Sequence, residues 1–163
     1  ADSLGELLDV GTGTGRMAEL FAPRTHHVTA FDKSPEMLRI ARARLQHLPS
    51  SDVDLVQGDF AVLPFETARF DTVLFHQVLH YAQHPEGVIA EAARVLAPKG
   101  RLIIVDFAVH DREELRRDFA HARLGFDDDT INGWFAHNGL TPVKDKSLHG
   151  GALTVRLWLA RKI

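Results

Sequence analysis

The sequence predicts a three-layer α/β fold on a mostly parallel sheet, with an antiparallel strand near its C-terminal end. Apolar runs typical of buried strands alternate with segments of helical period from Leu7 to Asp106. A glycine-rich turn follows the first of these runs, and two strand-like segments follow each other near the end of the chain. The length of 163 residues, of which 45% are hydrophobic, suits a single domain with a sizeable core.

The first predicted strand, 7–10, runs into a loop with glycines at alternate positions. These are Gly11, Gly13 and Gly15, with Thr12 between the first two. Glycine is required where the backbone turns sharply or approaches a ligand more closely than a Cβ allows. The dinucleotide fingerprint G-x-G-x-x-G needs its third glycine at the position of Arg16, so the spacing here differs from it. With Asp9 ahead of the loop, the pattern is D-x-G-x-G-x-G.

The second predicted strand, 27–31, ends at Asp32, which follows Gly11 by 21 residues. Nucleotide-binding folds place a carboxylate at about this separation, where it accepts hydrogen bonds from ribose hydroxyls. The alternative is that Asp32 only caps a loop. After Lys33, the pair Ser34-Pro35 predicts the N-cap and first position of a helix. Its apolar face consists of Met37, Leu38 and Ala41, and from the pattern alone Met37 is expected in the core.

Two further predicted strands have polar residues at their ends. The strand 53–57 is followed by Gly58, Asp59 and Phe60, and the strand 70–75 by His76 and Gln77. Ligands of open α/β sheets bind outside the carboxyl ends of the strands. Four polar residues should therefore meet at one edge of the sheet: Asp9, Asp32, Asp59 and His76.

The rest of the chain continues the alternation of helices and strands. Its period predicts a helix over 85–96, a break at 98–100 and a strand over 101–106. A charged helix is expected over 111–124 with Asp111 as its N-cap, and a second helix over 128–137. Two closing strands, 142–148 and 153–160, are joined through Gly150-Gly151. Such a closing pair is not typical of dehydrogenases.

Composition excludes several functions. The chain has no cysteine, so it forms no disulfide, thiolate nucleophile or cysteine-ligated metal site. The net charge of −3 gives no basic footprint for nucleic acid, and we expect no direct nucleic-acid contact. No run is long and apolar enough to span a membrane, and the N-terminus has no secretory pattern. We therefore expect a cytoplasmic protein without membrane contact.

These motifs, with the run 93–103 that leads into the fifth strand, resemble the class I S-adenosylmethionine (SAM) methyltransferases, particularly the ubiquinone/menaquinone-biosynthesis type. The resemblance covers the whole chain and implies a Rossmann-like sheet and SAM as cofactor. In that family the carboxylate matching Asp59 reaches the adenine amino group, and the helix start at Met37 lies beside the adenosine. The resemblance implies the following cofactor contacts: Asp9, Gly11, Thr12, Gly13, Gly15, Asp32, Lys33, Met37, Asp59, Phe60, His76 and Gln77.

A narrower resemblance is to the methyltransferase domain fused behind ArsR-type winged-helix regulators. It rests on the segments 75–80, 105–110, 119–126 and 153–161, although Phe119 stands where that group often has a second histidine. It implies N-terminal cap helices or an upstream domain outside residues 1–163, and a homodimer formed through that domain. Arsenite methyltransferases share the fold but hold their substrate with cysteines, which this chain lacks.

The expected reaction is in-line displacement of a methyl group from SAM onto a small-molecule acceptor, where positioning provides most of the acceleration. A general base is needed only if the acceptor must lose a proton. We predict His80 and His76 for this role, with Tyr81 and His121 as further candidates. If the segment after the fourth strand is helical, His76 and His80 share one face. His121 either faces the substrate or is a surface residue.

Other functions stay open at this point. The pair His76 and His80 with His84 suggests a metal site, but Pro85 interrupts the face and no acidic partner has the required spacing, so we predict no metal. A second hypothesis is that the chain is an effector domain of a transcriptional regulator, which senses SAM or S-adenosylhomocysteine with little or no turnover. An NAD-linked oxidoreductase is disfavoured by the glycine spacing and the closing strands.

Overall fold

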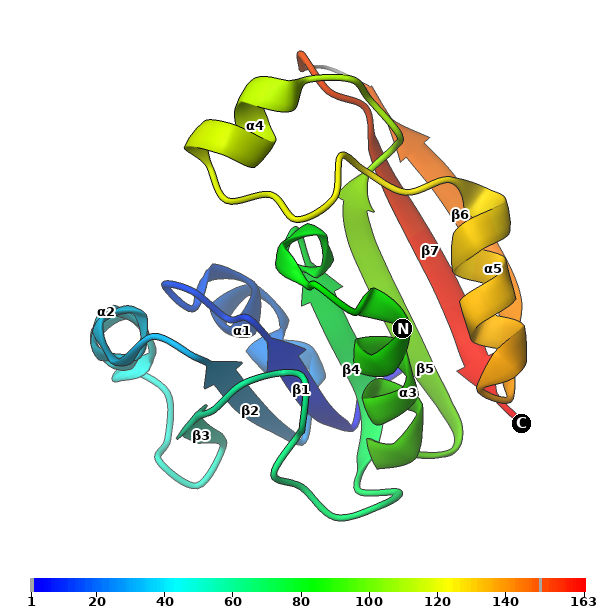
Figure 1. Cartoon of the computed structure of the whole chain (residues 1–163). Helices are drawn as coiled ribbons and strands as arrows, with labels where there is room; N and C mark the ends of the chain where they lie inside the picture. The colour runs from blue at the N-terminus through cyan, green and yellow to red at the C-terminus, as the bar shows by residue number, and fades with distance from the viewer. Residues whose placement is uncertain (1, 150) are drawn as a thin grey trace.

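The computed structural model describes residues 2–149 and 151–163, in which seven strands form one sheet in the order β3-β2-β1-β4-β5-β7-β6 (Figure 1). The parallel strands are β1 (Glu6–Val10), β2 (His27–Asp32), β3 (Val53–Gln57), β4 (Phe70–His76) and β5 (Leu96–Phe107). The strand β7 (Val155–Lys162) is antiparallel to both of its neighbours, β5 and β6 (Leu140–Leu148). The predicted fold class is confirmed. Gly150, in the predicted link between the closing strands, lies outside the described residues.

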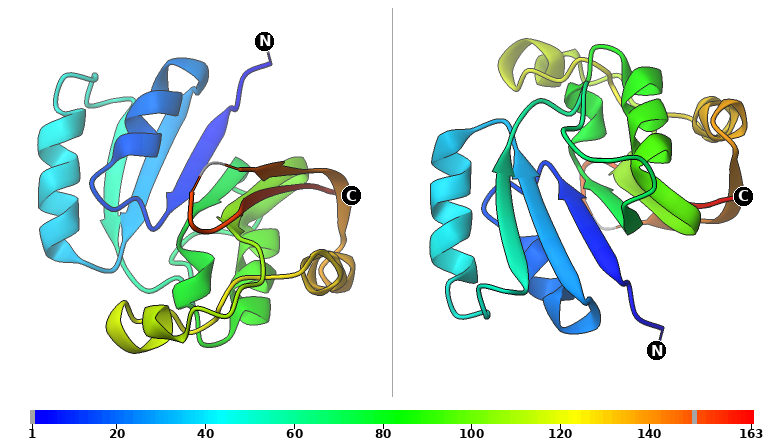
Figure 2. Two further views of the ribbon diagram at one scale, coloured as in Figure 1. Left: turned by 90° about the horizontal axis from the view of Figure 1, so that it is seen from above. Right: turned by 90° about the horizontal axis from the view of Figure 1, so that it is seen from below.

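Helices cover both faces of the sheet, as a three-layer fold requires (Figure 2). One face carries α1 (Arg16–Phe21) and α2 (Pro35–Leu45), and the other carries α3 (Pro85–Val95) and α5 (Asp128–His137). Successive side chains of a strand point to opposite faces, so β1 contributes to two cores. Leu7 belongs to the core beneath α1 and α2, whereas Leu8 and Val10 belong to the larger core beneath α3 and α5.

Short elements lie at both ends of the central strands. The 3-10 helix η1 (Ala22–Arg24) leads into the amino end of β2, whereas a second one, η2 (Leu79–Tyr81), follows the carboxyl end of β4. The helix α4 (Glu113–Asp118) and the chain after it lie over the ends of β4 and β5 in Figure 1. These segments bring residues distant in sequence next to the strand ends.

Two predicted boundaries are wrong. The strand β5 begins at Leu96 without a break at 98–100, because Leu96 already pairs with Phe70 ahead of a bulge in the register. The charged helix is much shorter than 111–124, and its N-cap is Arg112 in place of Asp111. Ala120 has a left-handed φ of 58°, which stops the helix, and the amides of Ala122 and Arg123 bind the carbonyl of His80. A tertiary contact thus replaces the helical hydrogen bonds.

One part of the sheet carries apolar side chains without a covering helix. Leu74, Ile103 and Leu159 are neighbours across β4, β5 and β7 on the face that carries α1 and α2. Those helices lie over β1, β2 and β3, and no helix of the part described packs over β5 and β7 on this side (Figure 2). Ile103, Leu157 and Leu159 are accordingly only half-buried. We call Ile103, Leu157 and Leu159 the open sheet face.

Candidate functional site

The loop after β1 is held to the end of β2 by backbone hydrogen bonds. The amides of Gly11 and Thr12 both donate to the carbonyl of Phe31, over 2.8 and 2.9 Å. The Gly13 amide donates to Asp32 Oδ2 over 2.8 Å, and the Ser34 amide donates to Asp32 Oδ1 over 2.9 Å. The carboxylate of Asp32 therefore fixes the loop while keeping lone pairs free for a ligand.

The three loop glycines have left-handed backbones but different surroundings. A Cβ on Gly11 would lie 2.6 Å from Val78, and one on Gly15 would lie 3.2 Å from Ala41. At Gly13, with φ of 57°, nothing lies within 4 Å of the Cβ position. Gly11 and Gly15 are thus required by packing, whereas Gly13 borders open space that a ligand can occupy.

Two adjoining cavities, of about 700 and 290 Å³, share Gly11 and Gly13 as a common wall. The predicted cofactor residues that line the larger cavity are Gly11, Gly13, Asp32, Lys33, Met37, Asp59 and Phe60. Those that line the smaller one are Asp9, Gly11, Thr12, Gly13, His76 and Gln77. Gly15 lines neither. The structure thus brings all of the predicted cofactor residues except Gly15 around one pair of cavities.

The larger cavity has an acidic rim and an apolar floor. Met37 is 41% exposed and borders the cavity, so its expected place in the core is wrong. Ser34 caps α2 as predicted, its side chain accepting a hydrogen bond from the Met37 amide. Asp59 is exposed and accepts from the Ala61 amide over 2.8 Å. Phe60 and Tyr81 contribute aromatic surface to the same cavity.

Asp9 is the buried charge of the smaller cavity. It is 1% exposed, and burial, with a smaller contribution from the charge of Asp32, raises its pKa to about 6. Hydrogen bonds from the Thr12 hydroxyl, over 2.8 Å, and from Ala18 oppose this shift. Among the ion pairs of residues 2–149 and 151–163, none involves Asp9. The site thus holds a desolvated carboxyl that a cationic ligand would favour in its ionised form.

The predicted shared helical face of His76 and His80 is wrong. His76 ends β4, Gln77 adopts a left-handed φ of 56°, and only the short η2 follows. His76 lines the smaller cavity, and burial lowers its pKa against the attraction of Asp106. His80 instead points to β5, where its Nδ1 lies 2.8 Å from Asp106 Oδ1.

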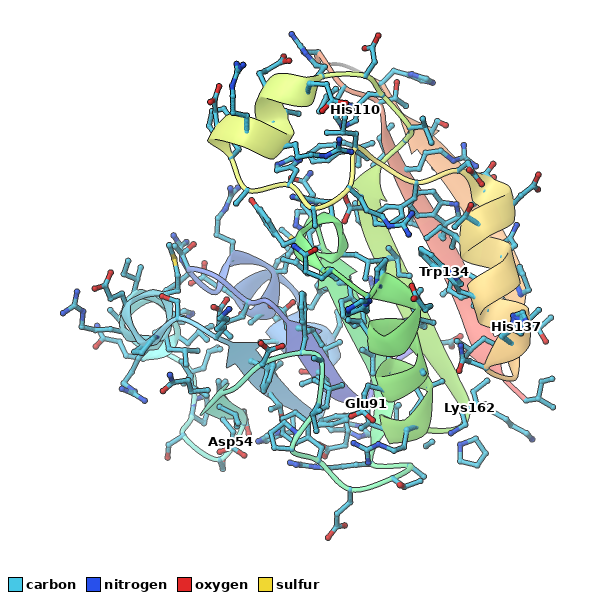
Figure 3. The ribbon with its side chains drawn as sticks, in the orientation of Figure 1. Asp54, Glu91, His110, Trp134, His137 and Lys162 are labelled. Carbon is cyan, nitrogen blue, oxygen red and sulfur yellow. The ribbon has the colours of Figure 1, made fainter. Side chains whose placement is uncertain are left out.

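The third histidine of interest, His121, is not a surface residue. It is 7% exposed, and its ring centroid lies 4.0 Å from that of His80 and 5.4 Å from that of Tyr81. Burial, and then the neighbouring His80, lower the pKa of His121. Figure 3 shows His110 beside α4 at the same end of the sheet. The strand ends therefore carry a cluster of imidazoles next to Tyr81 and the larger cavity.

Sequence reasoning missed Asp106 as a partner of His80. The signal was present, since Asp106 follows an apolar run in β5 just as Asp32 follows the apolar run of β2. Arg16 and Val78 were also missed as cavity walls, and nothing in their local sequence marks them.

Comparison with known proteins identifies the family of this chain. The family model "Methyltransferase domain" matches residues 8–104, more than half of the chain. Demethylmenaquinone methyltransferase of Tropheryma whipplei is 40% identical over 103 residues, which cover 63% of this chain and 42% of that protein. Phosphatidylethanolamine N-methyltransferase of Cereibacter sphaeroides is 36% identical over 112 residues, 68% of this chain and 55% of that protein. The chain thus spans about half or less of the length of these relatives.

Solved structures show the same fold along nearly the whole chain. The YcgJ protein of Bacillus subtilis has a TM-score of 0.84 at 20% identity, covering 99% of this chain and 93% of that one. The N-methyltransferase NodS of Bradyrhizobium japonicum, solved with S-adenosylhomocysteine, has a TM-score of 0.79 at 22% identity, covering 98% and 79%. None of the helices in residues 2–149 and 151–163 has the length and hydropathy of a membrane span. By its family model and its sheet order, the chain belongs to the class I SAM-dependent methyltransferases.

Proposed function

We propose that this chain binds SAM in the two adjoining cavities and transfers its methyl group to a small-molecule acceptor. One observation carries the proposal: both cavities share the glycine loop, and acidic side chains from the ends of β1 and β2 and from the residues just after β3 surround it. Membership of the family implies SAM as the methyl donor.

The residues of the cavities fit the chemistry of SAM. Asp9 is buried without a cationic partner among the described residues, and the ammonium and sulfonium groups of SAM supply positive charge. Arg16 lines the same cavity and suits the carboxylate of the ligand. Asp32 and Asp59 present oxygens that accept hydrogen bonds from hydroxyl and amino groups. Gly13 leaves space for close approach to the backbone.

The chain itself has to position the acceptor and, where needed, take up its proton. Bound SAM supplies an electrophilic methyl group and a good leaving group. Holding the two reactants in line can contribute about 7–11 kcal/mol to the lowering of the barrier. His76, at the smaller cavity, and His80, in η2 beside Asp106 of β5, are the proposed proton acceptors.

Isothermal calorimetry with SAM, S-adenosylhomocysteine and NAD tests the proposed cofactor. We expect micromolar binding of the first two and none of NAD. Binding of NAD in their place would overturn the proposal. A turnover assay with a broad set of acceptors completes the test. If SAM binds but no acceptor leads to formation of S-adenosylhomocysteine, an effector-sensing role is favoured.

A further inference from the structure

Three buried imidazole nitrogens at the strand ends have no hydrogen-bond partner. One is Nε2 of His110, whose side chain is half-buried. The other two are Nε2 of His80 and Nδ1 of His121, in side chains that are only 2% and 7% exposed. Buried polar atoms of folded proteins are nearly always hydrogen-bonded, and an exception calls for a missing partner. Because the two rings lie only 4.0 Å apart, one small polar group of a ligand can serve this region.

Asp106 determines which nitrogen of His80 carries the proton. Asp106 Oδ1 lies 2.8 Å from His80 Nδ1, and Oδ2 accepts the backbone amide of His80 over 3.2 Å. A carboxylate oxygen only accepts hydrogen bonds, so at this distance Nδ1 carries the proton. In the neutral ring, Nε2 then has a free lone pair. Nε2 is therefore an acceptor, and the partner it lacks is a hydrogen-bond donor.

The surroundings of His80 favour an uncharged, flat donor molecule. The rings of Tyr81 and Phe107 lie 4.1 and 5.1 Å from the His80 ring, centroid to centroid. The Asp106 carboxylate already accepts the His80 amide, the His80 ring and the Phe107 amide. It therefore offers little further charge to an ammonium group, whereas a neutral hydroxyl needs only the lone pair on Nε2.

We propose that His80 is the proton acceptor for a hydroxyl group on an uncharged, flat acceptor molecule, and that Asp106 is the positioning residue that holds the required tautomer. This inference rests on the proposed function and adds the chemical class of the acceptor. It also distinguishes His80 from His76, whose ring makes no hydrogen bond to a carboxylate within residues 2–149 and 151–163.

The step balances without a further reactant. The O–H bond of the acceptor breaks and its proton moves to Nε2 of His80. The oxygen then bonds to the methyl carbon, whose bond to the sulfonium sulfur breaks and leaves its electron pair on that sulfur. Asp106 stabilises the imidazolium, which later returns its proton to water.

The segment that carries His121 must move to admit the acceptor. His121 covers the ring of His80. Its segment is held by the Ala122 and Arg123 amides, which donate to the His80 carbonyl over 2.9 and 3.1 Å, and by the His121 amide, which donates to the Leu115 carbonyl over 3.2 Å. Ala120, directly before His121, has a left-handed φ of 58°, a conformation that is strained for alanine. Because only a few backbone hydrogen bonds hold the segment and the backbone at Ala120 is strained, the segment can move away from the His80 ring.

Nitrogen NMR of the histidine rings tests the inference in the full chain saturated with S-adenosylhomocysteine, so that no turnover occurs. His80→Gln assigns the signals of His80. We expect the tautomer with a proton on Nδ1, and titration with phenol should shift Nε2. Anisole, which has the same ring without the hydroxyl proton, should act roughly tenfold more weakly. Asp106→Asn should mix the tautomers, whereas His84→Gln, at an exposed histidine outside the imidazole cluster, should leave them unchanged.

Three results would overturn the inference: a proton on Nε2 in the unmodified chain, equal shifts with phenol and anisole, or no shift with phenol up to its solubility. If Asp106→Asn fails to fold by circular dichroism, the comparison of phenol with anisole still decides. Calorimetry of S-adenosylhomocysteine on the same samples separates the two proposals. Loss of that binding contradicts the proposed function, whereas normal binding with an unresponsive His80 contradicts only this inference.

Discussion

Burial sets the behaviour of Asp9, because its carboxyl lies beneath the glycine loop with the Thr12 hydroxyl as its side-chain hydrogen-bond partner. The pKa of Asp9 rises from 3.8 to about 6 in the folded chain, so the native state holds the proton more tightly than the unfolded state. Its contribution to stability is therefore fully present below pH 3.8 and is lost as the pH rises through about 6. At neutral pH the ionised Asp9 destabilises the empty protein.

Asp9→Asn should stabilise the empty protein and weaken SAM binding. The amide cannot ionise and its oxygen still accepts from Thr12, so the variant should gain up to about 3 kcal/mol in the free energy of unfolding at pH 7. It lacks the negative charge that favours a cationic ligand. Urea unfolding at pH 5 and pH 7, with calorimetry of SAM, measures both effects. If the difference in free energy of unfolding between the two proteins were the same at pH 5 and pH 7, the raised pKa of Asp9 would be contradicted.

Gly13→Ala should weaken SAM binding while the fold persists. The added Cβ meets no protein atom within 4 Å, so the expected loss of stability is the cost of a left-handed alanine, about 1–2 kcal/mol. Gly139→Ala is the matched control, because Gly139 also has a positive φ and open space but lines neither cavity. Calorimetry should show a loss of affinity only for Gly13→Ala. Equal affinities of both variants would mean that no ligand approaches Gly13.

At the scale of elements, α3 positions the long loop between β3 and β4. Arg94 donates to the carbonyls of Phe65 and Leu63, each over 2.9 Å, and Glu91 accepts the Leu63 amide over 2.8 Å. Figure 3 shows Glu91 on the part of α3 that faces this loop. The same loop begins with Asp59 and Phe60, which line the larger cavity. By holding the loop, α3 therefore helps to place these two cavity residues.

Arg94→Ala should lower the free energy of unfolding by about 1–3 kcal/mol, because two carbonyls and Glu91 lose a charged donor. Arg39→Ala, on the exposed side of α2, should change it by less than about 0.5 kcal/mol. Urea unfolding of the two variants makes the comparison. A similar small effect of both would show that the loop keeps its place without α3.

Elements with local signals were predictable, and those formed by tertiary contacts were not. The run from His27 to Asp32 and the Ser34-Pro35 cap depend on neighbouring residues, and both were predicted. The shortening of α4 depends on the carbonyl of His80, about 40 residues earlier in the chain, and no local pattern records it. The same holds for the candidate site. Polar residues at strand ends mark its edge, but the burial of His80 against Asp106 follows only from the packing of β5 and η2.

At the scale of the whole molecule, the open sheet face leaves apolar surface in contact with water. Ile103, Leu157 and Leu159 are half-buried without a covering helix within the described residues. Contiguous apolar surface of this kind favours association or binding of apolar molecules. The predicted upstream domain and homodimer stay predictions.

Leu157→Glu combined with Leu159→Glu should reduce self-association while the fold persists. Leu157 pairs with Lys146 and Leu159 with Lys144 across β6, so each new carboxylate gains an opposite charge on the neighbouring strand. Analytical ultracentrifugation and the fluorescence of an apolar dye measure the effect, with circular dichroism as the control for folding. Unfolding of the double variant would mean that these side chains pack in a core.

The antiparallel insertion of β7 between β5 and β6 has a consequence for synthesis on the ribosome. The outer edge of β5 pairs only with β7, which is made after α4, α5 and β6. A nascent chain that has already emerged through β5 therefore exposes an unpaired strand edge, the kind of edge that recruits other chains. The parallel strands β1 to β5 can assemble before synthesis ends. Until β7 has been synthesised and pairs with β5, that edge has to be protected by a chaperone or by rapid synthesis of the remaining chain.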